Sequence, residues 1–557
     1  MVVLKGQAPE GERNFYDRDE TLKKILAQSL PADFLQYADR ELSSFGGLAA
    51  NEIDERARHT DREGAPRLEK YDRLGEDISH VWVNEGYKKT VEETYATGIV
   101  GYVHKDIPEL GRKGNYVYSF AQGYLLSQSE PGFYCPVTLT MATAYLLDKF
   151  ADEEVKSRFL PHVCATGNFE LFEGATFLTE RQGGSDVGAN EVKAVKEGAD
   201  YRLYGEKYFA SNAGMAGVAM VLARIEGAAE GSRGLTLFAV PWRVDSKLNG
   251  IKIRRLKDKL GVRAVPSGEV EFDGAQAYVV GDPSQGLKYM MEALNLSRIC
   301  NAVASVGIMK RALDEAAEYA ERRNAFGRKL TEFPMVQDNL MKLRAKQEFE
   351  TVAIFDLISL YDRVTEGEAT ADEQVLNRLL IAILKKESAE QAIHFSHEAI
   401  EMHGGNGYIE DFVTPRLLRD AQVLTVWEGT ANILGLELIR LVNKFSAHEV
   451  FIRHVNSRLD GLAATVEVEV VRGKLKVLQV ELTAFADFDT DLQTFEAKGL
   501  MQKMAWLYEN MIALEWAEKH AGIYVPLAEI FTEMTWNTRE VGGAMKTVNY
   551  FSEVMGE

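Results

Sequence analysis

Glu428 stands between Trp427 and Gly429 in the string LTVWEGTANILGLELIR, where a short apolar run gives way to a predicted helix. Glycine allows a ligand to approach the backbone closely, and an indole ring can keep water from a neighbouring carboxylate. Loss of water raises the pKa of a carboxylate towards the value that a general base needs near neutral pH. The alternative is a first-turn acid that complements the helix dipole. Taken alone, the string favours this alternative.

Two strings further upstream could bind an anion or a flat ring. In FLTERQGGSDVGAN, Thr179 follows an apolar strand, and the loop Gly183–Asp186 supplies backbone amides that can approach an anion. In KYFASNAG, Phe209 and Ser211 alternate on a predicted strand, so they face the same side and could flank a heterocycle. The simpler interpretations are a capped tight turn for the first string and a core residue beside a rim residue for the second.

Two further strings lie in the C-terminal half. In ERRNAFGRKL, Arg322 and Arg323 precede Phe326 at the end of a long predicted helix. Arginine matches the geometry of phosphate, although a solvated basic helix end is an equally simple interpretation. In HGGNGYIED, the glycines predict a helix stop with exposed amides, which suits phosphate or ring edges. His394 and His397 have no third ligand at a suitable spacing, so no metal site is predicted.

The hydropathy pattern predicts an α+β multidomain protein with four parts. Residues 1–172 are mostly helical, with a polar, breaker-rich excursion at 59–80. Residues 173–285 contain short strands spaced about ten residues apart without helices between them, which predicts a β-sandwich or barrel and excludes a doubly wound nucleotide fold. Residues 286–444 carry long amphipathic helices that predict a four-helix bundle. Residues 445–557 form a helical C-terminal extension.

The composition is that of an ordinary globular protein, with 46% hydrophobic and 27% charged residues in a chain of 557. The net charge of −20 argues against general affinity for nucleic acid or anionic membranes. No run approaches the roughly 18 apolar residues of a membrane helix. The three cysteines form no CxxC pair. The first twenty residues lack the apolar core of a signal peptide, and VMGE is not a peroxisomal address, so we expect a cytoplasmic protein.

Five strings, in this order and spacing, resemble the acyl-CoA dehydrogenase family, and within it the AidB-like subgroup, named for a bacterial alkylation-response flavoprotein. The strings are FLTERQGGSDV, RLKDKLGVRAVPSGEVEF, RRNAFG, HGGNGY and VWEGTAN. The resemblance covers residues 45–444 and, more loosely, the tail. It implies an N-terminal helical domain, a central β-domain and a C-terminal four-helix bundle. It also implies FAD bound tightly between the β-domain and the bundle and completed by a neighbouring subunit, hence a homodimer or homotetramer.

The resemblance implies where FAD is contacted. The stretch after the first strand would meet the flavin ring and ribityl chain, and the KYFASNAG strand would lie along the ring, where many relatives have tryptophan and threonine. The arginine-rich and glycine-rich strings would reach the FAD of a neighbouring subunit, and the VWEGTAN string would lie near the pyrophosphate. The implied cofactor-binding residues are Leu178, Thr179, Ser185, Phe209, Ala210, Ser211, Arg323, Phe326, Glu401, Gly404, Gly405, Thr430 and Asn432.

The resemblance also implies a role for Glu428. In this family a carboxylate takes the α-proton of an acyl-CoA thioester while the β-hydrogen leaves as hydride to flavin N5, and an electron-transferring flavoprotein is the expected acceptor. A minority of relatives carry the base just before the arginine equivalent to Arg298, but Ser297 stands there. Glu428 is therefore the expected catalytic base. The implied substrate-binding residues are Ser185, Asn295, Ser297, Arg298, Trp427 and Gly429.

Departures from the common pattern leave a second function open. Pro334 replaces a glutamine that is frequent in the dehydrogenases, and the AidB-like group shares this feature. The alternative is therefore a stress-response flavoprotein with weak dehydrogenase activity and DNA association. From residue 444 onwards the chain has 17 acidic and 11 basic residues, which counts against DNA binding. An oxidase would differ mainly in access to the flavin, and the acyl chain length depends on helix packing that the sequence does not give.

Overall fold

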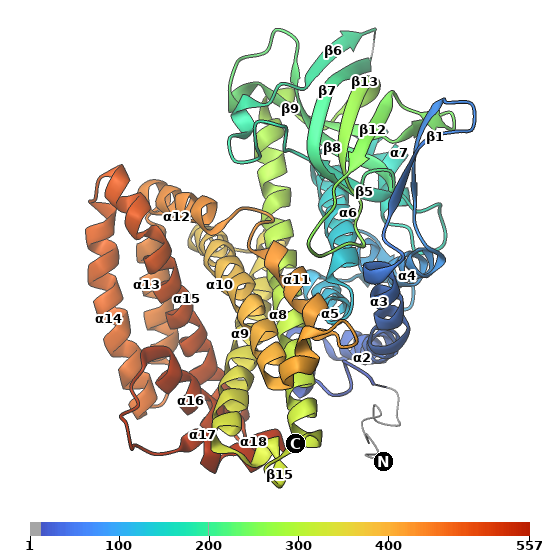
Figure 1. The fold of residues 1–557 in the computed structure, drawn as a ribbon. Coiled ribbons are helices and arrows are strands. Elements are labelled where there is room, and N and C mark those ends of the chain that lie inside the picture. The colour runs from blue at the N-terminus through green and yellow to red at the C-terminus, as the bar shows by residue number, and fades with distance from the viewer. Residues whose placement is uncertain (1–12, 199, 557) are drawn as a thin grey trace, which may run out of the picture. The chain divides into compact units, whose positions relative to one another are not determined.

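The computed structural model describes residues 13–198 and 200–556 (Figure 1). The predicted succession of a helical region, a β-domain and a second helical region is confirmed. The expectations about targeting depend on the extreme termini, and the first twelve residues and Glu557 lie outside the described residues. None of the helices in the described part of the chain combines the length and hydropathy that crossing a bilayer requires.

The described chain forms two compact units. The first comprises Arg13–Asp19 and Leu30–Cys300, and it holds the β-domain with the helices that precede it. The second comprises Glu20–Ser29 and the chain from Asn301 onwards, and it is helical. The long helix α8 (Gly286–Arg322) therefore contributes its first turns to one unit and the remainder to the other.

Three helices of the first unit, which begin at Glu85, Tyr116 and Glu153, are capped by the side chains of Asn84, Asn115 and Asp152. Asn84 accepts a hydrogen bond from the backbone of Tyr87 at 2.8 Å, and Asp152 accepts one from Val155 at 2.9 Å, which satisfies amides that have no partner within the helix. The sequence predicts a buried helix around Pro136–Phe150, and most of helix α6 there is buried. The helices are α2 (Ala32–Leu48), α3 (Asp54–Arg62), α4 (Glu85–Ala96), α5 (Tyr116–Ser127), α6 (Pro131–Phe150) and α7 (Glu153–Val163).

The polar excursion at 59–80 is a hairpin that packs on the β-domain. Its first residues complete α3, and the remainder forms the antiparallel strands β1 (Arg67–Tyr71) and β2 (Asp77–Trp82). Lys70 donates to the carbonyl of Ile253 at 2.8 Å, and the Ser79 hydroxyl accepts from the amide of Ile253 at 2.8 Å. These bonds attach the hairpin to an edge strand, which would otherwise offer unpaired backbone groups.

The β-domain is a closed barrel. Strand β8 pairs with β9, β9 with β13, β13 with β7, β7 with β6, and β6 returns to β8 in a parallel pairing. Strands β5 and β12 extend the sheet from β8 and β13. Closure removes the free edges of the ring. The strands are β5 (Glu173–Phe177), β6 (Lys193–Glu197), β7 (Asp200–Ser211), β8 (Ala216–Ile225), β9 (Leu235–Pro241), β12 (Ile251–Leu256) and β13 (Ser267–Val279).

Two details of the predicted strands are wrong. The hydropathy pattern predicts one strand in GEVEFDG and another in AYVVGD, but Ser267–Val279 is a single strand, β13, with a bulge between Asp273 and Ala275. Gly274 has φ +76° there, a conformation that glycine adopts without steric cost. The run IKIRRL was not expected as a strand, yet it forms β12, with Ile251 and Ile253 buried between exposed basic residues.

The second unit consists of an N-terminal helix, the bundle helices and the C-terminal extension. The bundle helices predicted from the sequence are present, and a further short helix, α11, lies between the glycine stop and Glu428. Helix α10 packs against α9, α11, α12 and α15. The helices are α1 (Glu20–Ser29), α8, α9 (Pro334–Glu366), α10 (Ala371–His403), α11 (Thr414–Leu424), α12 (Ala431–Phe445), α13 (Ala447–Asp460), α14 (Val466–Ala486), α15 (Thr490–His520), α16 (Tyr524–Trp536), α17 (Lys546–Asn549) and α18 (Phe551–Met555).

A buried ionic cluster joins the extension to the bundle. The Lys346 ammonium on α9 lies 2.8 Å from Glu387 on α10, 2.6 Å from Glu509 on α15 and 3.2 Å from Glu350. All four side chains are buried. Burial raises the pKa of Glu509 to about 7, an effect that the nearby ammonium only partly offsets. The extension is therefore part of the core of its unit and not a loose appendage.

Candidate active site

Glu428 lies in a strained loop and not in a helix. Helix α11 ends at Leu424, and α12 begins at Ala431 with Thr430 as its N-cap residue. Glu428 has φ +59° and Gly429 has φ +104°. A non-glycine residue with left-handed backbone costs on the order of 1–3 kcal/mol and clusters at functional sites. The geometry excludes the simpler interpretation of a first-turn helix acid.

Both ends of the Glu428 loop are held by side chains from neighbouring helices. The Asn301 side chain on α8 donates to the carbonyl of Leu424 at 3.2 Å. The Lys385 ammonium on α10 donates to the carbonyl of Gly429 at 2.8 Å, and Lys385 is only 1% exposed. One carboxylate oxygen of Glu428, Oε2, is shielded from solvent. The loop therefore presents a carboxylate whose position is set by its anchors and its backbone.

Sequence reasoning missed both anchors. Lys385 follows the apolar run IAIL on α10, where the helical repeat places a charged residue on the buried face. A lysine at a buried helical position needs a hydrogen-bond acceptor. This is the sequence feature that could have identified Lys385 as an anchor. Asn301 occupies a buried position of α8 and gave a similar, weaker signal.

The glycine stop after α10 leaves backbone accessible. Helix α10 ends at His403, whose imidazole bonds the carbonyl of Ala399 at 2.7 Å. Gly404 has φ +60°, and a Cβ added at Gly404 or Gly405 would meet no atom of the described chain within 4 Å. Glu401, in the last helical turn, is exposed. The helix stop that the sequence predicts is therefore present, and it leaves open space beside the backbone of Gly404 and Gly405.

The RRNAFG string forms a tight hairpin with an exposed aromatic tip. Strands β14 (Asn324–Ala325) and β15 (Arg328–Lys329) flank Phe326 at φ +51° and Gly327 at φ +86°. Two left-handed central residues are typical of a turn that prefers Asn-Gly. Phe326 is nevertheless the first of them, and its side chain is 98% exposed. Arg323 is also exposed. Backbone strain of this kind clusters at functional sites.

In the first unit, the stretch after β5 is fixed through its backbone. The carbonyl of Leu178 accepts from Asn190 at 2.8 Å and from Lys207 at 3.2 Å. A Cβ at Gly184 would come within 2.5 Å of the Thr179 hydroxyl, so Gly184 packs closely against Thr179. The loop then places Ser185 in solvent. Backbone amides and hydroxyls at this end of the barrel are thus accessible to a ligand.

Phe209 is the extra residue of a β-bulge on β7. Ala210 pairs with Gly268 and Tyr208 with Glu269, so Phe209 has no partner position in the register. Its φ is +58°, and its side chain is 58% exposed. Ala210 is buried and Ser211 is half-buried. Bulges commonly redirect a side chain next to an active site, and this one turns an aromatic ring into solvent.

The predicted substrate residues on α8, Asn295, Ser297 and Arg298, belong to the first unit. Ser297 and Arg298 are buried, and Asn295 is half-buried. The guanidinium of Arg298 donates to the Asn295 side chain at 3.2 Å. The structure thus brings these three residues together on one helix, and no carboxylate competes with Glu428 at Ser297.

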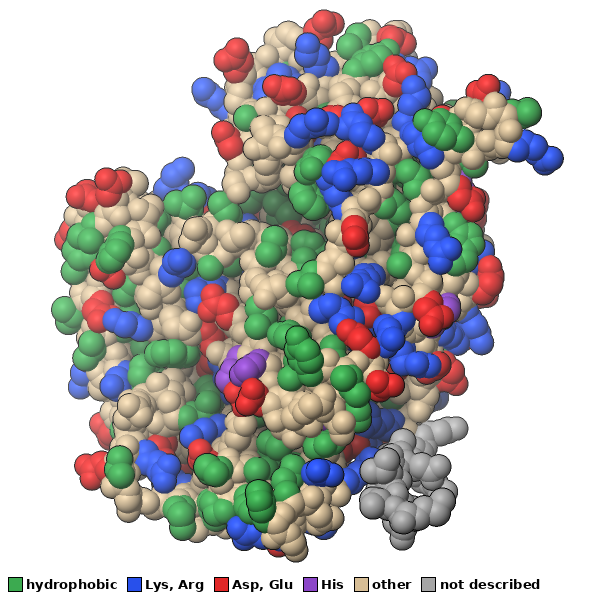
Figure 2. All heavy atoms as spheres, viewed as in Figure 1, with side chains coloured by type: hydrophobic (Ala, Val, Ile, Leu, Met, Phe, Trp, Pro, Cys, Tyr) green, Lys and Arg blue, Asp and Glu red, His purple; other side chains and the backbone are tan. Residues whose placement is uncertain are grey.

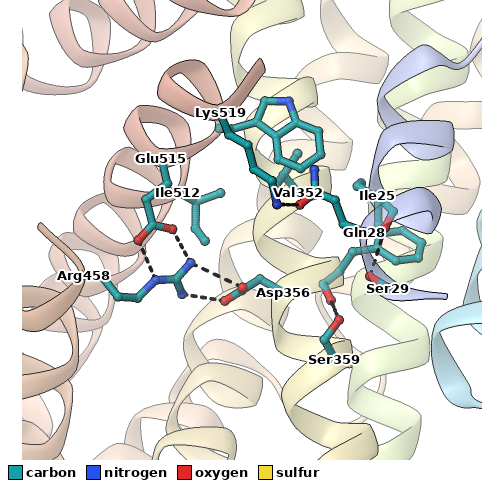
Figure 3. A pocket seen from close by; sticks show the side chains of 12 residues that line it. Ile25, Gln28, Ser29, Val352, Asp356, Ser359, Arg458, Ile512, Glu515 and Lys519 are labelled. Carbon is teal, nitrogen blue, oxygen red and sulfur yellow. Dashed lines mark hydrogen bonds and ion pairs between the residues drawn. The ribbon is translucent and has the colours of Figure 1, made fainter. Parts of the chain in front are cut away.

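A pocket of about 270 Å³ lies elsewhere in the second unit, between α1, α9, α13 and α15 (Figure 3). Figure 3 shows Arg458 between Asp356 and Glu515, and its guanidinium lies 2.8 Å from both carboxylates. Lys519 donates to Gln28 at 2.7 Å. Asp356, Arg458 and Glu515 form ion pairs within this pocket, and it contains none of the residues predicted for the site.

Comparisons with known proteins agree with this architecture. Residues 284–443 match the sequence model of the acyl-CoA dehydrogenase C-terminal domain, and residues 175–275 match that of the middle domain. Residues 7–168 match the N-terminal domain of the adaptive response protein AidB. The chain belongs to the acyl-CoA dehydrogenase family, a family of flavoproteins, which confirms the predicted oxidoreductase class and the predicted FAD.

Within the family, the chain is similar to AidB-like members, as predicted. It is 32% identical to acyl-CoA dehydrogenase family member 11 of Caenorhabditis elegans, with 85% of this chain and 79% of that protein covered. It is 31% identical to the putative acyl-CoA dehydrogenase AidB of Escherichia coli K12, with 80% of each covered.

Solved structures show the same fold. The crystal structure of Caenorhabditis elegans ACDH-11 in complex with C11-CoA has a TM-score of 0.87 at 28% identity, over 99% of this chain and 97% of that one. An acyl-CoA dehydrogenase complexed with FAD from Bacillus anthracis has a TM-score of 0.76 at 18% identity, over 95% and 96%, which shows the fold alone.

Proposed function

We propose that the protein is an FAD-dependent acyl-CoA dehydrogenase that forms the trans-2-enoyl thioester, with Glu428 as the base. The observation that carries this proposal is the Glu428 loop, whose carboxylate stands outside any helix, on left-handed backbone and between two anchors. A base must be held at a fixed place relative to the proton it removes. The loop meets this requirement, and Ser297 offers no rival carboxylate.

The chain's own residues would act as follows. Glu428 takes the α-proton of the thioester, and Lys385 keeps the Gly429 carbonyl, and with it the turn, in place. FAD, when bound, supplies the acceptor for the hydride that leaves the β-carbon. Asn295 and Arg298 line the thioester side. A thioester α-proton is only weakly acidic, so hydrogen bonds to the carbonyl must stabilise the developing charge.

The residues present fit FAD. Gly404 and Gly405 leave open space beside their backbone, as a close-lying phosphate or ring edge requires. Arg323 is exposed and can bind pyrophosphate in bidentate geometry. Thr430 and Asn432 lie exposed at the start of α12, where helix amides favour an anion. We include in the proposal that Phe326 and Arg323 reach the FAD of a neighbouring subunit in a homodimer or homotetramer.

The remaining partners are part of the same proposal. An electron-transferring flavoprotein would take the electrons, and the protein would work in the cytoplasm. On the face shown in Figure 2, basic and acidic side chains are interspersed and do not gather into a basic stripe. DNA binding requires clustered Lys and Arg, and the chain from residue 444 onwards has 17 acidic against 11 basic residues, so the alternative of a DNA-associated flavoprotein is not favoured.

The decisive experiment replaces the base. Glu428→Gln should keep FAD bound but slow its anaerobic bleaching by acyl-CoA esters by at least about 10³-fold, since the amide cannot accept the proton. Glu449→Gln, on an exposed position of α13, is the matched control and should behave as the parent. If Glu428→Gln bleaches as fast as the parent with a full complement of FAD, Glu428 is not the base. A panel of chain lengths in the same titration identifies the substrate.

A second experiment tests the cofactor contact. Arg323→Ala should lose FAD during gel filtration, because the exposed guanidinium would no longer neutralise the pyrophosphate. Arg322→Ala is the control, since Arg322 already pairs with Glu318 at 3.3 Å. Equal retention of FAD by both variants would contradict the role of Arg323.

A further inference from the structure

Helix α14 carries two apolar stripes, although only one of them is buried. The inner stripe packs inside the extension, where α14 contacts α13, α15 and α16. It consists of Val468, Val471, Leu475, Leu478, Leu482 and Phe485, all buried. The outer stripe consists of Val466, Val470, Gly473, Val477, Val480 and Ala484. Figure 1 shows α14 as the outermost helix of the extension.

The outer stripe is regularly spaced, and all its members are exposed except Val470, which is half-buried. Val466 is 75% exposed, Val477 58% and Val480 70%. Its members alternate steps of four and three residues, which is the heptad spacing of a helix–helix seam. A surface helix ordinarily turns polar residues outward. A Cβ at Gly473 would meet no atom of the described chain within 4 Å, so another backbone could approach closely there.

Charged residues flank this stripe in a self-complementary order. Glu467 and Glu469 border its first turn, and Lys474 and Lys476 stand one heptad later on the same two flanks. If a second α14 ran antiparallel, with Val466 opposite Val477, each glutamate would stand opposite a lysine. The contact is symmetric, so the pairing of Glu467 with Lys474 and of Glu469 with Lys476 occurs twice. Flanking charges of this kind set partner choice and orientation.

We propose that the outer stripe of α14 is an interface between two copies of this chain, related by a twofold axis with the two helices antiparallel. A self-complementary patch is what a twofold interface requires, because the same surface serves both partners. The stripe belongs to the C-terminal extension, so this contact is separate from the subunit contact proposed for Arg323 and Phe326. It does not rest on the proposed catalytic activity.

The first test measures assembly mass. In the full-length holoprotein, the double variant Val477→Glu and Val480→Glu should halve the mass found by sedimentation or light scattering at micromolar concentration. Gln479→Glu adds a charge to the same exposed helix outside the stripe and should leave the mass unchanged. Thermal unfolding should match the parent, because the substituted side chains are exposed. An unchanged mass for the double variant, or a parent that is monomeric, would overturn the proposal.

The second test asks whether the partner of the outer stripe is a second copy of this chain or a different molecule. Glu469→Lys should weaken assembly about tenfold or more by placing like charges opposite each other, and adding Lys476→Glu should restore it. Restoration by the second charge is expected only if the helix pairs with itself. Cysteines at positions 470 and 473, introduced into separate chains, should cross-link in the mixture. Cross-linking of either variant with itself alone, or failure of the charge reversal to restore assembly, would overturn the antiparallel self-contact.

Discussion

The Glu428 loop and the Lys346 cluster both hold charged side chains in the helical unit. The unfavourable energy comes from backbone strain at the loop and from burial of charged groups at the cluster. At the loop, the backbone is strained while the carboxylate stands outside regular structure between two hydrogen-bonded anchors. At the cluster, three regular helices bring one ammonium and three carboxylates together away from water. The loop suits a group that must exchange a proton with a ligand. The cluster suits permanent docking of the extension.

The largest expected effect on stability comes from breaking the cluster. Lys346→Met would leave the buried side chains of Glu350, Glu387 and Glu509 without their cation, and removing one partner of a buried ion pair costs about 3–5 kcal/mol. Urea unfolding of this variant should show that loss at neutral pH. Lys342→Met, one turn earlier and with its side chain 42% exposed, is the control and should cost less than about 1 kcal/mol. Equal losses would show that the cluster does not stabilise the docking.

The cluster should also make stability depend on pH. Because the pKa of Glu509 is raised to about 7 in the fold, the folded protein holds this proton more tightly than the unfolded chain. The stabilisation is complete below the ordinary glutamate pKa and is lost as pH rises to about 7. The change is on the order of 3 kcal/mol. Glu509→Gln should flatten the dependence of the unfolding free energy between pH 5 and 8.

A second buried glutamate, Glu173 in the other unit, also contributes to the pH dependence of stability and must be separated from Glu509. Burial also raises the pKa of Glu173, on β5, to about 7, and Glu173 remains in both proteins. The difference between the parent and Glu509→Gln therefore isolates the cluster. The same slope in both would show that Glu509 is ionised in the fold at pH 5.

A smaller effect is expected at the loop. Lys385→Met removes a charge-assisted hydrogen bond to Gly429, which contributes about 1.5–3 kcal/mol. We expect FAD to stay bound and its reduction by substrate to slow by about 10²-fold, because the base moves from its position. Lys386→Met is the control, since Lys386 bonds Gln502 at 2.9 Å in the extension. If Lys386→Met slows flavin reduction more than Lys385→Met does, Lys385 is not the side chain that positions the base.

The smallest effect concerns strain at the hairpin tip. Phe326→Asn should raise the free energy of unfolding by about 1 kcal/mol, because asparagine tolerates the left-handed backbone better than phenylalanine. The gain should come with weaker FAD retention if the ring serves a neighbouring subunit. Phe326→Leu keeps the strain and should show no gain in thermal unfolding. A gain of equal size for leucine would mean that strain is not its cause.

Much of the fold follows from the local pattern of apolar and polar residues. The rest depends on contacts between distant segments, which that pattern does not specify. Helical periodicity and strand spacing sufficed for the helix–barrel–helix order. The parallel closure of β6 on β8 could not be predicted, because it joins segments whose local sequences do not specify a partner. The string around Glu428, taken alone, favoured a first-turn helix acid, and only the family resemblance implied a catalytic base. Neither predicted the loop with its left-handed φ, whose two ends bond side chains on α8 and α10. The Lys346 cluster escaped notice because its partners come from three helices.

The closed barrel has a consequence for synthesis of the chain. The ring needs β13, which ends at Val279, while β6, where the ring begins, starts at Lys193. Until the last strand has left the ribosome, the earlier strands have open edges that can pair wrongly. At about 5–20 residues per second, this vulnerable stage lasts on the order of ten seconds. A pause or truncation between these strands would therefore leave open edges that can aggregate, whereas after Val279 all strands of the ring have been synthesised.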